Sequence, residues 1–277
     1  MKKMHIMIIV ISVVSVVVIL SLIFTLGMRT YISGGDIGII EIENFIATSK
    51  LSVKDLKDFK DNPSIKAVVI RVDSPGGIVA ASQEIYDEVK EVKEKKKVIV
   101  SMGAVAASGA YYISLPADVI VANPGTITGS IGVIMEFPVI EELLKKLGIR
   151  FEAIKSKEHK DIGSPFRPMS EKERKLLQGV ISDIYEQFID AVAKDRNLPK
   201  DSVLKFADGR IFSGRQAKEF GFVDTLGSFE DAVKIAGDLV GIEKPHLVYP
   251  PQRLSFIDFF TKPMESLLSP RISYLWQ

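Results

Sequence analysis

Short apolar runs alternate with amphipathic segments along most of the chain. Five β-branched runs, bounded by Gly, Pro, Asn or Asp, predict strands at residues 37–43, 65–73, 97–102, 118–123 and 149–156. Between the second and third runs, apolar side chains from Ile78 to Val92 recur at steps of four and three, which predicts a helix. Strands that alternate with helices indicate an α/β fold with a mostly parallel sheet, covered on both faces.

A longer helix is predicted to begin after Ser170. Ser170 and Glu173 fit a capping box, in which each side chain accepts a hydrogen bond from the backbone N–H of the other residue. The apolar face of this helix consists of Leu177, Val180, Ile184, Phe188 and Val192. We expect the helix to end near Asn197 and Pro199. The sequence contains no internal repeat, so one domain accounts for the whole pattern.

The first residues form an uncharged apolar segment at 6–26, which as a helix is long enough to cross a bilayer core of about 30 Å. Lys2 and Lys3 precede it, and such charges favour the cytoplasmic side. A cleaved signal peptide is the alternative, but its apolar core is usually only about 7–15 residues long. Because this segment is longer and is followed by a poor cleavage site, we expect a retained single-pass anchor with the rest of the chain outside the cytoplasm.

Four parts are expected along the chain. These are a cytoplasmic stub and transmembrane anchor at 1–28, a linker at 29–36, a globular domain at 37–250 and an apolar tail at 251–277. The tail is rich in aromatic residues and is broken by Pro263 and Pro270. We expect it to pack on the domain or on a neighbouring subunit, and contact with the membrane surface is the alternative.

The charges of the chain nearly cancel, with 36 Lys and Arg residues against 35 Asp and Glu residues. No nucleic-acid partner is expected, because phosphate binding requires a basic face. The lack of cysteine excludes disulfides, thiolate metal sites and cysteine nucleophiles. Histidine occurs only as His5, His159 and His246, without the paired spacing of a metal site. We therefore expect no metal and no cofactor, and a Ser-His-Asp triad has little support.

Three glycine-rich stretches follow predicted strands, namely "DSPGG" at 73–77, "GAVAASG" at 103–109 and "NPGTITGSIGV" at 123–133. The carboxyl ends of parallel strands lie at one edge of a sheet, where ligand sites collect. Backbone N–H groups at such turns can bind the oxyanion that develops during acyl transfer. Glycine also marks tight turns without a chemical role, and the first two stretches lack the spacing of phosphate-binding loops.

Four motifs in order make the pattern specific: "DSPGG", "MGAVAASGAYYISLPADVIVANPGTITGSIGV", "IKSKEHKDIGSPFRPMSEKE" and "DGRIFSGRQAKEFGFVDTLGS". Over residues 37–240 the chain resembles the signal peptide peptidase A (SppA) family of membrane-bound serine proteases, in its short single-domain form. The resemblance implies a ClpP/crotonase-type fold of stacked βαβ units. It also implies that the domain at 37–250 is the protease domain and that the chain assembles into a homo-oligomeric ring.

The resemblance also implies a role for five residues. Ser108 in "AASGAYY" matches the nucleophilic serine, and Lys160 in "EHKDIGSP" matches the general base. Ser130 in "TGSIGV" matches the serine that helps to orient the lysine amine. Gly77 and the backbone N–H of Gly109 match the oxyanion-hole positions.

A serine–lysine pair is a known variant of triad chemistry. A lysine amine ordinarily has a pKa of about 10.4, and it acts as a base near neutrality only where its charged form is disfavoured, as burial does. Asp161 follows Lys160 directly. Because a carboxylate facing Lys160 would stabilise the ammonium, we expect Asp161 to point away from it.

The resemblance implies a membrane-anchored serine endopeptidase that degrades remnant signal peptides and other apolar peptides. Three alternatives remain open from the residues. The glycine turns would also suit a crotonase-like acyl-CoA enzyme, which needs an oxyanion hole for a thioester. The chain would alternatively be a catalytically idle membrane scaffold, or a stomatin-cleaving membrane protease that uses the same serine–lysine chemistry.

Overall fold

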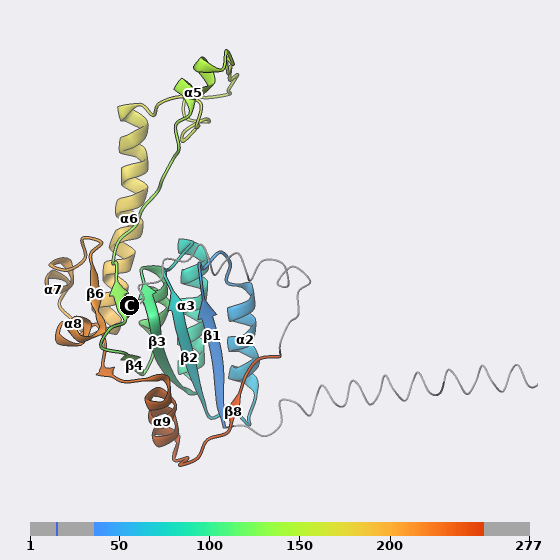
Figure 1. Ribbon diagram of the computed structural model, residues 1–277, viewed down its shortest axis with the longest axis vertical. Coiled ribbons are helices and arrows are strands. Elements are labelled where there is room, and N and C mark those ends of the chain that lie inside the picture. The colour runs from blue at the N-terminus through green and yellow to red at the C-terminus, as the bar shows by residue number, and fades with distance from the viewer. Residues whose placement is uncertain (1–14, 16–35, 252–277) are drawn as a thin grey trace, which may run out of the picture.

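The computed structural model describes Ser15 and residues 36–251 (Figure 1). Nearly all of the predicted anchor and of the apolar tail lies outside the described residues. Within the described part, no helix is both long enough and apolar enough to cross a bilayer. In chain order the elements are β1 (Ile37–Glu43), α2 (Lys50–Asp61), β2 (Ala67–Ser74), α3 (Val79–Lys93), β3 (Lys97–Ala107), α4 (Gly109–Ser114), β4 (Val119–Ala122), β5 (Ile127–Gly129), α5 (Glu141–Lys146), α6 (Glu171–Asp195), α7 (Lys200–Leu204), β6 (Ile211–Ser213), α8 (Gly214–Glu219), β7 (Thr225–Leu226), α9 (Phe229–Val240) and β8 (Leu247–Val248).

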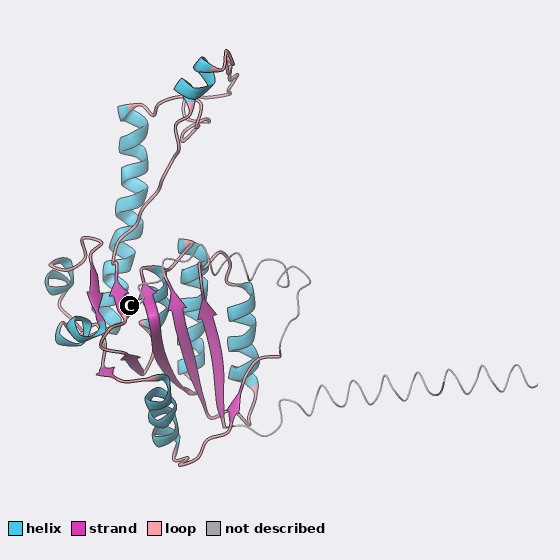
Figure 2. Cartoon of the chain, in the orientation of Figure 1, coloured by secondary structure: helices cyan, strands magenta, loops and turns pink. Residues whose placement is uncertain are grey.

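The strands form one sheet around the long strands β1, β2 and β3 (Figure 2). Its order is β6-β5-β3-β2-β1-β8, with β4 also paired to β3 and β7 paired to β4. Each of these pairs is parallel except β5 with β6. The mostly parallel sheet predicted from the alternating pattern is therefore confirmed.

Helices cover both faces of the central strands. In β1, Ile40 and Ile42 belong to the larger core, which α2, α3, α4 and the end of α6 share. Ile37 and Ile39 alternate with them and pack with α9 on the opposite face. Successive side chains of a strand point to opposite faces, so a strand covered on both sides needs apolar residues at nearly every position. This requirement explains the continuous β-branched runs of the sequence.

The strand β3 extends five residues beyond its predicted end. Val72 of β2 pairs with Met102 and Ser74 pairs with Ala106, so three residues of β3 lie opposite Asp73 alone. The Asp73 carboxylate accepts a hydrogen bond from the backbone N–H of Val105 at 3.0 Å. Past this bulge, β3 changes partner from β4 to β5. The small residues that predict a glycine-rich turn at 103–107 therefore continue the strand, and the turn itself is confined to Ser108.

The strand predicted at 149–156 is wrong, because this segment belongs to an arm without strands at residues 133–170. The N–H of Ile149 donates to the carbonyl of Leu144 and closes α5, and the ring of Phe151 stacks on Phe166 with centroids 3.9 Å apart. The alternation of apolar and polar residues resembles that of a strand. No neighbouring strand offers the segment a hydrogen-bonding ladder, so the alternation alone does not produce one.

The helix α6 begins with the predicted capping box, in which Ser170 and Glu173 each accept from the other's backbone N–H. Its C-terminal half packs on the body, where Phe188 and Val192 are buried. Val180 remains 48% exposed although it lies on the same predicted face. Figure 1 shows the reason: the N-terminal half of α6 projects from the body together with the arm that contains α5.

Replacing Asp73 with alanine should destabilise the fold. The change leaves the Val105 N–H without its acceptor at the bulge, and because Val105 is half-buried this costs about 1 kcal/mol, the lower end of the range for a buried donor. Asp73→Asn keeps a side-chain oxygen that can accept the same bond, so it should retain most of the stability. Urea unfolding of the two variants and the wild type measures this difference. Equal stability of Asp73→Ala and the wild type would contradict the role assigned to the carboxylate.

Candidate active site

Ser108 lies at the sharp junction between β3 and α4. Its backbone has φ 55° and ψ −122°, a region that residues other than glycine rarely occupy. Its N–H donates to the carbonyl of Gly129 at 2.8 Å, and its own carbonyl accepts from Tyr112 at 2.9 Å. Holding such a conformation costs about 1–3 kcal/mol, and strain of this kind concentrates at functional sites. Nucleophilic serines of hydrolases often occupy a strained strand-to-helix turn of this type.

Two glycine turns approach each other beside Ser108. A Cβ atom at Gly76, where φ is 101°, would lie 2.7 Å from the backbone nitrogen of Gly109. A Cβ atom at Gly109 would lie 3.2 Å from the backbone nitrogen of Gly77. Within the described residues, neither the N–H of Gly77 nor that of Gly109 donates a hydrogen bond to an acceptor. A side chain at Gly76 or Gly109 would therefore obstruct the space beside Ser108, where the two free N–H groups lie.

A pocket opens in front of these groups, between α3, α4 and α6. Its walls are mostly apolar. They comprise Gly77, Val79, Ser82, Gln83, Ser108, Gly109, Tyr112, Gly132, Val133, Ile184 and Phe188. The pocket thus joins the serine and the two free N–H groups to a surface that suits an apolar side chain.

Ser130 follows β5 directly, next to the residue whose carbonyl fixes Ser108. Its backbone also has positive φ, at 51°, and its N–H donates to the carbonyl of Arg210 at 2.9 Å. Within the described residues, the hydroxyl of Ser130 makes no hydrogen bond. Ser108, Gly77, Gly109 and Ser130 are therefore gathered around one edge of the sheet.

Within one chain, Lys160 does not lie beside these four residues. It is exposed on the arm, where its turn is tied to the first residues of α6: Glu158 accepts from the Lys172 amine at 2.9 Å. The pocket is lined by Ile184, which lies twelve residues beyond Lys172. Twelve residues correspond to roughly 18 Å along a helix axis. A single copy of the chain therefore does not bring Lys160 to Ser108.

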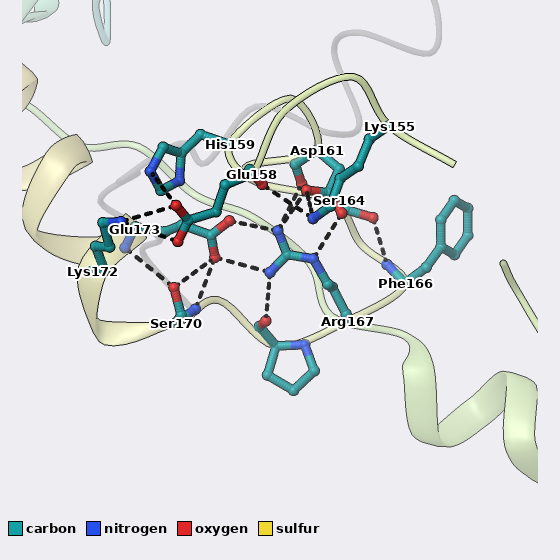
Figure 3. Close-up of polar contacts among 11 residues, drawn as sticks. Lys155, Glu158, His159, Asp161, Ser164, Phe166, Arg167, Ser170, Lys172 and Glu173 are labelled. Atoms are coloured by element: carbon teal, nitrogen blue, oxygen red, sulfur yellow. Dashed lines mark hydrogen bonds and ion pairs between the residues drawn. The ribbon is translucent and has the colours of Figure 1, made fainter. Parts of the chain in front are cut away.

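The carboxylate of Asp161 is turned toward Arg167 and Lys155, as Figure 3 shows. Hydrogen bonds from the Arg167 guanidinium, and then from the Lys155 amine, hold the pKa of Asp161 well below its usual range. Asp161 is thus engaged by other cations, in agreement with the expectation that it does not face Lys160.

Sequence analysis missed the pocket walls contributed by helices. Ile184 and Phe188 fit the apolar face predicted for α6, and that pattern does not distinguish a pocket wall from the core. Tyr112 follows the serine motif without a distinct signal. The length of the apolar face of α6 was the available clue, because a face this long extends beyond the sheet and part of it is left to line a pocket. Arg167, which stands between Phe166 and Pro168, was also given no role.

Comparisons with known proteins match two peptidase family models and several proteins named as proteases. The family described as peptidase family S49 matches residues 90–243, and the family described as Clp protease matches residues 39–119. A Synechocystis sp. protein, named as a putative protease, is 47% identical over 74% of this chain and 74% of its own length. "Protease 4" of Haemophilus influenzae is 40% identical over 79% of this chain but over only 35% of its own length. "Serine protease SPPA, chloroplastic" of Arabidopsis thaliana is 35% identical over 66% of this chain and 27% of its own length.

The solved structure of a ClpP1 variant from Listeria monocytogenes matches with a TM-score of 0.50 at 19% identity. The match covers 71% of this chain and 94% of the ClpP1 chain. At this identity the likeness concerns the fold alone. It confirms the ClpP-type α/β fold that the motif resemblance implied.

The close approach at Gly109 predicts a specific pairwise effect on stability. A Cβ atom at this position would lie 2.5 Å from Oγ of Ser82, which is buried and donates to the carbonyl of Ile78. Gly109→Ala should therefore destabilise the protein by about 1–3 kcal/mol, and Ser82→Ala in the same chain should restore much of the loss. Unfolding free energies of both single variants and the double variant measure the coupling. If the change in unfolding free energy of the double variant equals the sum of the two single changes, the predicted clash between the added Cβ atom at position 109 and Ser82 Oγ is absent.

Proposed function

Because the chain belongs to peptidase family S49, which confirms the resemblance to SppA, we propose that it is a membrane-anchored serine endopeptidase with a Ser108–Lys160 dyad. The single observation that carries this proposal is the strained turn at Ser108, which adjoins the two free N–H groups of Gly77 and Gly109. The family match favours this function over an acyl-CoA enzyme.

The proposed reaction follows from these groups. Ser108 Oγ attacks the scissile carbonyl carbon while its proton passes to the amine of Lys160. The N–H groups of Gly77 and Gly109 bind the oxyanion of the tetrahedral intermediate. Lys160 then gives its proton to the leaving amine as the peptide bond breaks, and the free hydroxyl of Ser130 orients the lysine amine. Water hydrolyses the acyl-enzyme with Lys160 again acting as the base.

In this proposal the lysine amine comes from a neighbouring subunit. Two features support it. Lys160 lies on the outer arm of its own chain, and the arm exposes large apolar side chains, among them Ile134, Leu147 and Ile154. Such side chains are a liability in water unless another surface covers them. A head-to-tail contact that repeats around an axis closes into a ring, and it would complete every site in turn.

Apolar peptides are the proposed substrates, with remnant signal peptides as the leading class. The walls formed by Val79, Tyr112, Ile184 and Phe188 support this choice, because they offer an apolar side chain a desolvated site. The apolar segment at 6–26 supports anchoring in the cell membrane, with the domain at 37–250 outside the cytoplasm. An enzyme held there meets such peptides where they are released.

Removing either dyad side chain should stop cleavage without unfolding the protein. Ser108→Ala should leave no detectable hydrolysis of a synthetic signal peptide followed by mass spectrometry. Lys160→Ala should lower kcat by about 10²–10⁴-fold, the usual contribution of a general base. Lys157→Ala, on the same turn, is the matched control and should cleave at nearly the wild-type rate. Cleavage by Ser108→Ala at the wild-type rate would reject the proposed function.

Mixed assemblies test the origin of the lysine. Ser108→Ala and Lys160→Ala chains are coexpressed in equal amounts and assemble at random. A site built from two subunits is intact only where the chain that supplies the serine keeps Ser108 and its neighbour keeps Lys160, which is about a quarter of the sites. Activity should therefore reappear at about a quarter of the wild-type level. If differently tagged variants copurify in one assembly and remain inactive, the lysine does not come from a neighbour.

A further inference from the structure

We propose that Arg167 is a positioning residue for Lys160: it fixes the turn that carries the amine and occupies the carboxylate beside it. This inference rests on the proposed function, in which Lys160 is the base. It concerns the charged cluster at the junction of the arm and α6, formed by Lys155, Glu158, His159, Asp161, Arg167, Lys172 and Glu173 (Figure 3).

Arg167 grips Asp161 with a two-pronged contact. Its Nε donates to one carboxylate oxygen at 2.9 Å, and its Nη2 donates to the other at 2.8 Å. The same Nη2 lies 3.4 Å from the Asp161 backbone carbonyl. Since Asp161 is the residue after Lys160, this fork fixes the turn on which the lysine amine stands. A planar guanidinium suits such a contact, whereas a lysine ammonium offers only a point charge.

The other side of the same guanidinium reaches α6. Nη1 and Nη2 donate to the two carboxylate oxygens of Glu173 at 2.9 and 2.5 Å. Glu173 is buried and also accepts from the backbone N–H of Ser170, so it cannot shift easily. Hydrogen bonds from Arg167, and then from Ser170, lower the pKa of Glu173 to about 2. Arg167 therefore ties the lysine-bearing turn to a rigid helix end.

The second effect concerns charge around Lys160. Glu158 lies two residues before Lys160 and Asp161 lies directly after it, and each of these carboxylates is paired with another cation. Lys172 binds Glu158, whereas Arg167 and Lys155 bind Asp161. The groups around the turn are Lys157, Glu158, His159 and Asp161 on the turn itself, Lys155 and Arg167 from the adjoining segments, and Lys172 and Glu173 from α6. Within the described residues, the amine of Lys160 has no ion-pair or hydrogen-bond partner.

An unpaired amine is what a base for a neighbouring Ser108 requires. A lysine accepts the serine proton only in its neutral form, and a carboxylate partner stabilises the ammonium instead. If Arg167 is removed, Lys155 still binds one carboxylate oxygen of Asp161, but the other oxygen loses its donor and becomes available to Lys160. The ammonium is then favoured, so the pH at which the base loses its proton must rise. The limb on which kcat/KM increases with pH should move in the same direction.

The experiment measures kcat/KM for a synthetic signal peptide against pH, with full-length assembled protein. For Arg167→Ala we expect the rising part of the kcat/KM profile to move to higher pH by about one unit. The maximal kcat/KM should also fall, because the turn that carries Lys160 is less well fixed. The double variant Arg167→Ala, Asp161→Asn removes the competing carboxylate. Its limb should return to the wild-type position while its plateau stays low. Arg174→Ala is the matched control. Among the residues that the structure describes, this side chain makes one exposed ion pair, with Glu171 at 3.8 Å, so the rising limb of this variant should not move.

Arg167→Lys keeps the charge but not the fork, and it provides a second variant should Arg167→Ala fail to assemble. Its limb should move in the same direction by a smaller amount. If the rising limb of kcat/KM against pH stays at the wild-type position in the Arg167 variant that assembles, the inference is overturned. It is also overturned if the double variant Arg167→Ala, Asp161→Asn shows the same shift as Arg167→Ala. Failure of the proposed function looks different: wild-type protein would not cleave the peptide, or Lys160→Ala would cleave it normally.

Discussion

The site depends on one backbone constraint, the positive φ of Ser108 where β3 passes into α4. The bulge opposite Asp73 sets the length of β3 before this point, and the carbonyl of Gly129 holds the Ser108 N–H. Positions 76 and 109 are both glycine, and a Cβ atom at either would crowd the other turn. The two turns can therefore approach closely and leave two N–H groups free beside the hydroxyl. The strain is balanced by the surrounding sheet, which is buried on both faces.

The helix α6 links two regions that a single chain keeps apart. Its C-terminal half supplies Ile184 and Phe188 to the pocket, and its N-terminal end holds the arm through Glu173. The same helix therefore contacts both the arm and the pocket. In the proposed assembly, each chain would use this helix twice, once to shape its own pocket and once to present Lys160 to the next.

Local patterns predicted the parts of the fold that local physics determines. The strands β1, β2 and β4, the helix α3 and the capping box at Ser170 appear close to where the sequence placed them. The arm did not follow from its pattern, because strand formation at 149–156 depends on a pairing partner that the sequence does not display. The motifs located the serine and the glycines. Their mutual approach, and the fork that Arg167 makes with Asp161, depend on contacts between segments that no spacing reveals.

The central claim is that the hydroxyl of Ser108 and the amine of Lys160 meet between subunits. The chain has no cysteine, so Ser108→Cys in one tagged copy and Lys160→Cys in a differently tagged copy each introduce one thiol per chain. Treating the mixed assembly with a short bismaleimide should give a cross-linked species that carries both tags, mapped by mass spectrometry to positions 108 and 160. A chain that carries both substitutions serves as the comparison. Cross-linking within that chain, with none between the differently tagged copies, would contradict a site shared by two subunits.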